Sequence, residues 1–276
     1  MFLFRPRGSE ITRRKPEALW LLSSMPIIAF LIIPVLALLG TAHPSEVLQN
    51  LQTDEAQSAM KLSLYTSVIA TLLALVLGTP LAYLLARRTF PFRGGLDTLV
   101  DLPILIPPAV AGIGLLVAFG RQGLIGSHLR AFGIELPFTA VAVIMAQLFV
   151  AAPFYVRAAS IGFARADSEM EEAAQLDGAG SWQAFRDLHL PLAWAALVSG
   201  CVTTWARALG EFGATIIFAG NFPGRTQTMP LAIYLGFELD FRVAASLSVV
   251  LLLSSFLLLL AVRSLIAKAE PVTLQQ

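Results

Sequence analysis

The chain has 276 residues, of which 57% are hydrophobic and 13% charged, and its mean hydropathy is +0.75. Soluble domains carry about 25% charged residues, so this composition excludes an ordinary soluble domain and favours a chain that lies mainly in a lipid bilayer. The net charge of +1 decides nothing, because in a membrane protein the placement of charge matters more than its sum. A single cysteine excludes an internal disulfide.

Uncharged runs predict six transmembrane helices, and therefore an all-α polytopic membrane protein. A spanning helix needs about 20 predominantly apolar residues, and a helix satisfies its backbone polar groups internally. The runs without any charged residue are 18–39, 62–86, 102–120, 136–156 and 243–262. A sixth, 192–219, is interrupted only by Arg207 and Glu211. The first run is longer than the 7–15 or so apolar residues of a signal peptide, so we expect a retained helix.

Lysine and arginine gather on one side of these spans, which the positive-inside rule assigns to the cytoplasm. The residues on that side are Arg5, Arg7, Arg13, Arg14, Lys15, Arg87, Arg88, Arg93, Arg157, Arg165, Arg186, Arg263 and Lys268. Those on the other side are Lys61, Arg121, Arg130, Arg225 and Arg242. We therefore expect a multi-pass protein of the cytoplasmic membrane with both termini in the cytoplasm. Its expected parts are a basic tail at 1–17, an additional helix at 18–40, a five-helix core domain at 60–265 and a tail at 266–276.

One long polar segment, residues 158–191, lies on the predicted cytoplasmic side before the penultimate span. Connections in helical bundles are usually 2–8 residues long, so this length suggests a structured loop with a partner, although an ordinary connection is the alternative. Ser168 and Glu171 have the spacing of a capping box, which predicts a helix beginning near Glu169.

Two glycines are expected to end that helix. Gly178 and Gly180 interrupt the pattern, and Ser181 can cap a second short helix. Pro191 then suits the first turn of the next membrane helix. The segment therefore predicts a helix–turn–helix that projects from the membrane.

This segment resembles the "EAA" loop of bacterial and archaeal ABC importer permeases. Glu-Ala-Ala at 172–174 is followed by Gly178 and then by Leu-x-Leu-Pro at 188–191, although the family usually has isoleucine where Leu188 stands. In that family the loop docks into a cytoplasmic ATPase subunit. The resemblance thus implies a coupling role for Glu172, Ala173, Ala174, Asp177, Gly178, Ala179, Leu188, Leu190 and Pro191.

The chain has no G-x-x-x-x-G-K-[ST] loop of the kind that holds nucleotide phosphates. Its three histidines match no metal-ligand spacing, and no carboxylate pair or Ser/His/Asp set is evident. We therefore expect neither a catalytic site nor a metal site. The resemblance implies that ATP-Mg is used by a separate ATPase subunit and that this chain binds no cofactor.

The run at 101–120 contains helix-breaking residues inside an expected span. Pro103, Pro107, Pro108, Gly112 and Gly114 predict a kinked or broken helix, because proline removes a backbone donor and clashes with the preceding turn. Irregular backbone within a membrane is tolerated in protein or beside a cavity. Either a kink shaped for packing or a helix lining the transport pathway is consistent with this pattern.

Arg207 and Glu211 are four residues apart, on one face of a helix, and are expected to pair. Ionisable residues inside a membrane usually face a bundle interior or a watery cavity. The pair is either purely structural or part of a gate. The small residues around it permit close helix approach and are Ala206, Gly210, Gly213 and Ala214.

The stretches "ARALGEFGAT", "AGNFPGRTQTMPLAIY" and "LPILIPPAVAGIGLLVAFG" are similar to those of molybdate permeases, with sulfate and tungstate permeases as relatives. The resemblance implies a type I importer: a homodimer of this chain, two ATPase subunits and an extracytoplasmic oxyanion-binding protein, with no nucleic acid. Pathway or gate residues would be Pro107, Pro108, Gly112, Arg207, Glu211, Gly213 and Thr215. Asn221, Arg225 and Thr226 would form an external turn near the gate, unless it is only a solvated loop.

The sequence thus favours the transmembrane permease subunit of an ATP-driven oxyanion importer, with molybdate as the expected anion. A sulfate/thiosulfate or tungstate ABC permease is the alternative. An ion-gradient-driven secondary transporter would not need the coupling loop, and a membrane scaffold would not explain the proline-broken third span.

Overall fold

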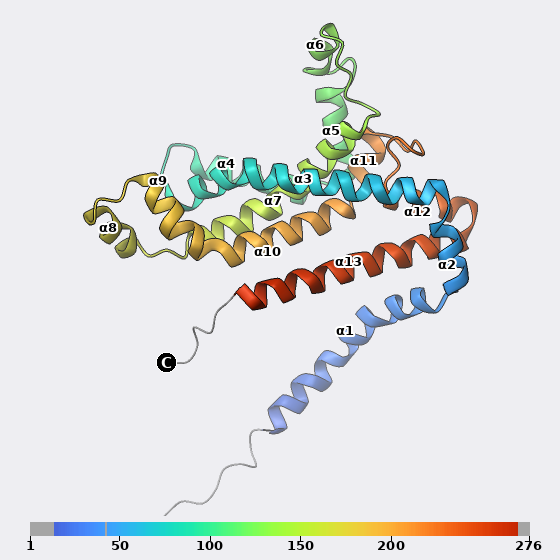
Figure 1. Ribbon diagram of the computed structural model, residues 1–276, viewed down its shortest axis with the longest axis horizontal. Helices are drawn as coiled ribbons and strands as arrows, with labels where there is room; N and C mark the ends of the chain where they lie inside the picture. The colour runs from blue at the N-terminus through green and yellow to red at the C-terminus, as the bar shows by residue number, and fades with distance from the viewer. Residues whose placement is uncertain (1–13, 42, 270–276) are drawn as a thin grey trace, which may run out of the picture.

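The computed structural model describes residues 14–41 and 43–269, and all regular elements in that part of the chain are helical (Figure 1). In chain order they are α1 (Arg14–Thr41), α2 (Pro44–Leu51), α3 (Asp54–Arg87), α4 (Arg93–Leu105), α5 (Pro108–Phe119), α6 (Gly126–Ala131), α7 (Ala140–Phe163), α8 (Ser168–Leu176), α9 (Ser181–Ala184), the π-helical turn η1 (Phe185–His189), α10 (Leu190–Leu209), α11 (Gly213–Phe218), α12 (Met229–Leu239) and α13 (Phe241–Ala269).

Membrane-spanning helices dominate the architecture. Four helical runs are long and apolar enough to cross a bilayer: Leu19–Thr41, Asp54–Arg87, Ala140–Phe163 and Ser181–Leu209. α4 and α5 pass the same test as one pair, bent by 115°. α13 has 29 residues, and its apolar stretch covers Phe241–Leu257. All six predicted segments are therefore helical, and the all-α polytopic architecture is confirmed.

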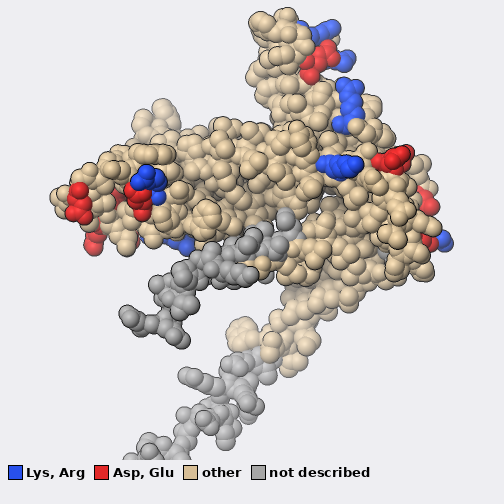
Figure 2. Space-filling view, viewed as in Figure 1, with Lys and Arg blue, Asp and Glu red and all other residues tan. Residues whose placement is uncertain are grey.

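The long helices α3, α7, α10 and α13 run in roughly the same direction in Figure 1. α8 and α9 form one end of this bundle, α2 and α12 lie at the other, and α5 with α6 projects sideways as an arm. α1 diverges from the bundle. On the face shown in Figure 2, the charged side chains gather at the two ends and on the arm, and the surface between them is uncharged.

Small residues allow the central helices to approach closely. A Cβ on Gly78 of α3 would lie 2.9 Å from Cδ1 of Tyr155 in α7. A Cβ on Gly162 of α7 would lie 2.7 Å from Cβ of Ala196 in α10. Within lipid, helices associate through such close van der Waals packing rather than through the hydrophobic effect. α3, α7 and α10 therefore form the packed centre of the bundle.

The third predicted span is broken, as expected. Ile106 and Pro107 each precede a proline and adopt extended backbone, with ψ of 142° and 139°. The ring of a following proline disfavours helical backbone at the preceding residue. Two such residues in succession account for the 115° bend between α4 and α5.

Two of the predicted span boundaries are wrong. α7 continues to Phe163, so Arg157 lies inside a helix rather than in a loop. The predicted span 192–219 is not one helix, because α10 ends at Leu209 and α11 begins at Gly213. Nothing in the sequence marked this break, because the residues around it are largely apolar or small and continue the apolar run.

Pro191 lies in the first turn of α10, as predicted, although α9, η1 and α10 together form one continuous helical run from Ser181 to Leu209. The π-turn η1 ends two residues before Pro191, and the Leu190 amide donates to the Phe185 carbonyl. A proline inside a helix cannot donate to the residue four positions earlier. The wider π-turn accommodates this missing donor.

Candidate functional site

The loop between α8 and α9 is built around Gly178. This residue has φ +88°, and the Ala179 amide donates to the Ala174 carbonyl at 2.9 Å, while the Gly178 amide donates to Gln175 at 3.0 Å. These two bonds form a Schellman motif, in which glycine takes the left-handed position at low cost. Gly178 therefore ends α8, as the sequence predicted, and turns the chain toward α9.

The two predicted helix caps are wrong. α8 begins at Ser168, one residue before the predicted start, but its N-cap is Asp167, and the Glu171 side chain binds elsewhere instead of closing a capping box. α9 begins at Ser181 with Gly180 as the N-cap, and the Gln183 carboxamide oxygen accepts the Gly180 amide at 2.8 Å. α9 thus begins with a bond to Gln183 in place of a serine cap, whereas Asp167 makes no side-chain cap bond at α8.

Glu171 links α8 to the end of α3. Its Oε2 accepts a hydrogen bond from Arg87, whose Nη1 also donates to the Ala166 carbonyl at 2.7 Å. The bond from Arg87 lowers the pKa of the Glu171 carboxyl below its usual value. Nε2 of the fully buried His189 lies 3.6 Å from the same carboxylate oxygen. One carboxylate therefore connects the loop to α3 and contacts η1.

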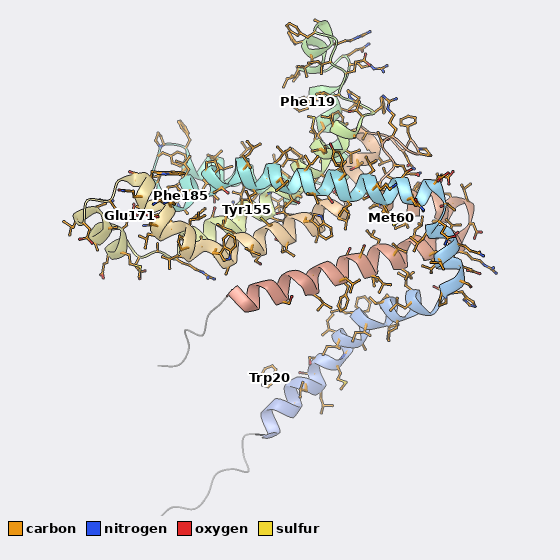
Figure 3. The ribbon with its side chains drawn as sticks, in the orientation of Figure 1. Trp20, Met60, Phe119, Tyr155, Glu171 and Phe185 are labelled. Carbon is orange, nitrogen blue, oxygen red and sulfur yellow. The ribbon has the colours of Figure 1, made fainter. Side chains whose placement is uncertain are left out.

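An aromatic cluster anchors the second half of the loop. The ring of Phe185 in η1 lies 5.1 Å from Tyr83 in α3 and 5.9 Å from Phe163 in α7. Trp182 stacks on Phe185 at 5.4 Å. In Figure 3 Glu171 and Phe185 lie close together at one end of the bundle, away from Met60 at the other end. The loop thus contacts α3 and α7 and is continuous with α10.

The loop presents apolar side chains at its surface. Leu176 is 88% exposed, Trp182 70% and Met170 49%. Of the predicted coupling residues, Glu172, Ala173, Asp177, Gly178 and Pro191 are exposed, whereas Ala174, Ala179, Leu188 and Leu190 are half-buried. Exposed apolar side chains together on one projecting loop are typical of a protein interaction site.

The predicted pathway glycines meet at the contact between α5 and α11. A Cβ on Gly112 would lie 2.8 Å from Cβ of Ile217, and one on Gly213 would lie 2.7 Å from Cβ of Pro108. Pro107 is the N-cap of α5 and Pro108 its first residue. These prolines and glycines therefore set how the arm packs on the break that follows α10.

Arg207 and Glu211 pair, with Nη1 2.8 Å from Oε2. Glu211 is only 1% exposed and lies in the break between α10 and α11, where its Oε1 accepts the Ala214 amide at 2.8 Å. A carboxylate at a helix start satisfies a free amide and the local dipole. The expected pairing is thus present, but it joins a helix to a break rather than two positions of one helix. Thr215, the remaining predicted gate residue, is fully buried in α11.

In the predicted external turn, 220–229, the side chains of Asn221 and Thr226 form hydrogen bonds within the chain. Thr226 is buried, accepts the Phe222 amide at 3.1 Å and donates to the Gly220 carbonyl. Asn221 donates to the Leu231 carbonyl at 3.4 Å. Arg225 is exposed. Of these three predicted contact residues, Arg225 is the one whose side chain is free to meet another molecule.

Residues 74–270 match the family model described as "Binding-protein-dependent transport system inner membrane component". This chain belongs to that family. It is consequently an integral membrane protein and the permease component of such a system, rather than an enzyme.

Named relatives share most of the permease chain. It is 39% identical over 235 residues to "Molybdenum transport system permease protein ModB" of Mycobacterium tuberculosis, covering 85% of this chain and 89% of that one. It is 34% identical over 259 residues to "Probable sulfate transport system permease protein cysT" of Chlorokybus atmophyticus, covering 92% and 90%.

A solved structure has the same fold. The bacterial ABC transporter that imports the acidic polysaccharide alginate superimposes with a TM-score of 0.73 at 17% identity, covering 91% of the permease and 96% of that chain. At this identity the similarity establishes the fold alone.

Sequence reasoning missed one charged cluster of the permease. Arg157 in α7 binds Asp97 and Asp101 of α4, with Nε 2.6 Å from Asp101 Oδ1 and Nη2 2.8 Å from the Asp97 carbonyl. The spacing of the two aspartates, four residues apart, places them on one helical face and was the available signal. Among the described residues, no group of three or more histidine, cysteine or acidic side chains is arranged to hold a metal.

Proposed function

We propose that this chain is the permease subunit of an ATP-driven importer of a tetrahedral oxyanion, and that the anion is molybdate. The similarity to ModB, whose printed name assigns it to molybdenum transport, supports the choice of anion. In this proposal two copies of the chain form the pathway, and an extracytoplasmic binding protein delivers the anion.

Two cytoplasmic ATPase subunits drive transport, each docked on one coupling loop. We assign the coupling surface to residues 168–191, where exposed Leu176, Trp182 and Met170 suit an apolar groove on the partner. The basic residues near this end support its cytoplasmic placement, with both termini on the same side. ATP-Mg is then bound and hydrolysed by the partner, and this chain needs no cofactor.

The coupling loop moves the bundle because it is tied to three helices. The Arg87–Glu171 bond carries displacement of α8 into α3, and the aromatic contacts of Phe185 carry it into α3 and α7. Closure of the ATPases would therefore rock each copy as a unit, and the pathway between the copies would open alternately to either side. The anion passes without covalent chemistry.

The break between α10 and α11 is assigned to the pathway gate. There the charge of Arg207 is balanced by Glu211, so the site does not present an uncompensated cation to a passing dianion. A pathway must bind its ion weakly enough to release it. This pairing favours passage over retention.

Sulfate is the second candidate, because the chain is also similar to cysT, whose printed name assigns it to sulfate transport. Molybdate, tungstate and sulfate are all tetrahedral dianions. Uptake of radiolabelled molybdate decides between them, measured in cells with and without the chain and before and after ATP depletion, with tungstate or sulfate in excess. Chain- and ATP-dependent uptake that tungstate blocks and sulfate does not is expected. Strong sulfate competition would reassign the anion, and uptake independent of the chain would refute the substrate.

A further inference from the structure

A groove of about 920 Å³ runs between α3 and the helical run that begins at α9. Its walls are apolar side chains of α3 and α10, with Tyr155 of α7 and Phe185 of η1 also in the lining. Figure 3 shows these two labelled residues on the same stretch of the bundle. Trp182 and Phe185, at one end of the groove, belong to the coupling loop, but the walls formed by α3 and α10 have no role in the transport mechanism proposed above. The principal apolar residues of its walls are Leu75, Val76, Leu84, Trp194, Leu197 and Val198.

Two hydroxyl groups in the wall of the groove, those of Thr79 and Tyr155, already have hydrogen-bond partners. The hydroxyls of Thr79 and Tyr155 are 2.6 Å apart, and Thr79 also donates to the Leu75 carbonyl at 2.6 Å. Since the Thr79 proton is used on the carbonyl, the Tyr155 hydroxyl donates to Thr79. Because these hydroxyls already have partners, a molecule in the groove does not need to form hydrogen bonds with them. The groove is therefore suited to a hydrocarbon chain.

One charged residue, Arg88, lines the groove, and it stands at the end nearest the coupling loop. Its side chain is exposed, and no carboxylate is paired with it among the described residues. Glu171, whose pKa it also helps to lower, is bound to Arg87 instead. A guanidinium forms two parallel bonds with a phosphate. Trp182 lies at the same end, as aromatic residues do where a bilayer meets water.

The groove has the dimensions of one leaflet. From Leu75 to Arg88 is about 20 Å at 1.5 Å per residue, against about 15 Å for half of the hydrocarbon core. Basic residues between transmembrane helices on the cytoplasmic side are typical sites for anionic headgroups. We propose that this groove binds an anionic phospholipid of the cytoplasmic leaflet, with an acyl chain along α3 and α10 and its phosphate on Arg88.

Charge argues against the main competing occupant, helix α1 of a second copy. α1 begins with Arg14 and Lys15, so its basic end would face Arg88 with a charge of the same sign. Like charges at close range destabilise a contact. An anionic headgroup instead supplies the missing partner.

Quenching of tryptophan fluorescence by brominated lipids tests the proposal. The full chain carries Trp20, Trp182, Trp194 and Trp205, so Trp20→Phe with Trp205→Phe leaves only the two groove residues as reporters. This protein is reconstituted in phosphatidylcholine vesicles that contain brominated phosphatidylglycerol or brominated phosphatidylcholine in increasing fractions. We expect half-maximal quenching at an about fivefold lower fraction of the anionic lipid, the effect of one arginine near an anionic headgroup.

Two variants test whether Arg88 causes the preference for the anionic lipid. Arg88→Gln removes the preference for the anionic lipid, whereas Arg186→Gln keeps it, because exposed Arg186 is paired with Asp187 outside the groove lining. Equal quenching by both lipids, or a preference that survives Arg88→Gln, overturns the proposal. Weak quenching by both lipids also overturns it, because a protein segment would then cover the groove. Molybdate uptake is not part of these readouts, so the result is independent of the proposed substrate.

Discussion

Arg157 of α7 binds Asp101 of α4 through two parallel hydrogen bonds, Nε to Oδ1 and Nη2 to Oδ2, each 2.6 Å long. The same guanidinium reaches Asp97, one turn away on α4. α4 leads into the 115° bend and from there to the arm. This one side chain thus ties α4, the first half of the broken segment, to α7.

We predict that Arg157→Lys does not replace arginine. A lysine ammonium is a point charge and cannot form the bidentate bond to Asp101 while also contacting Asp97. The melting temperature in detergent is expected to fall by several degrees, and uptake several-fold. Asp101→Asn should have a similar but smaller effect, since it keeps a hydrogen-bond acceptor. Arg242→Gln, which removes an exposed pair with Glu46 far from the coupling surface, is the control and should leave both unchanged. A fully active Arg157→Lys protein would show that the bidentate bond to Asp101 is not needed.

The conformation of Gly178 predicts an order of substitutions. A Cβ there meets no atom within 4 Å, so within this chain only the backbone conformation, φ +88°, resists a side chain. Asparagine adopts that region more easily than alanine, and valine least of all. We expect uptake to be highest in Gly178→Asn, lower in Gly178→Ala and lowest in Gly178→Val. For alanine the left-handed backbone should cost about 1 kcal/mol of folding free energy.

The same series separates two roles of Gly178. A protein in which all three substitutions abolish uptake equally, while membrane insertion is normal, would show that side-chain size at the ATPase contact decides the outcome. The backbone explanation would then be wrong. Co-purification of the ATPase with each variant measures the contact directly.

Glu171 should make stability depend on pH. Its folded pKa is lowered by Arg87 below the ordinary 4.5, so the stabilisation is fully present above the unfolded pKa and is lost as pH falls through the folded pKa. At pH 7 we expect Glu171→Gln to melt at a lower temperature than the wild type. The difference should shrink as the pH falls below about 4.5. A difference that stays constant from pH 7 to pH 3.5 would exclude the ionised bond as its cause.

Gly112 and Gly114, two residues apart on α5, serve as a test position and its control. A Cβ on Gly112 would lie 2.8 Å from Cβ of Ile217 and 2.9 Å from the Ala214 carbonyl oxygen, whereas one on Gly114 meets nothing within 4 Å. Overpacking typically costs about 1–3 kcal/mol. Gly112→Ala is therefore expected to lower the melting temperature and uptake, and Gly114→Ala to leave both nearly unchanged. Equal behaviour of the two variants would mean that α5 does not depend on its contact with α11.

Neutralising both Arg207 and Glu211 distinguishes a gating role of this ion pair from a purely structural one. Glu211→Gln alone leaves a partly buried arginine without its partner, which costs several kcal/mol within a protein interior. The double variant Arg207→Gln/Glu211→Gln removes that unpaired charge and should restore folding, measured by thermal melting. If the pair belongs to the gate, as we propose, uptake remains low although folding recovers. Recovery of both would make the pair purely structural.

Local physical chemistry made several features readable from the sequence. A bilayer leaves few options for apolar runs, so the helical character of the six segments followed from the positions of the uncharged runs, although not the break within 192–219. Prolines 107 and 108 break a helix wherever they stand, and Gly178 ends one because only glycine takes its backbone angle cheaply. These effects act over a few residues and need no knowledge of neighbouring helices.

Tertiary structure decided the partners of the charged residues. Glu171 could have closed its own helix, but Arg87, 84 residues earlier in the chain, binds it instead. Arg157 was expected in a loop and instead lies within α7, bound to two aspartates of α4. Such choices depend on which helices pack together, and that packing rests on close contacts such as Gly162 against Ala196. The free energy of each contact is shared between distant segments, so no local pattern in the sequence contains it.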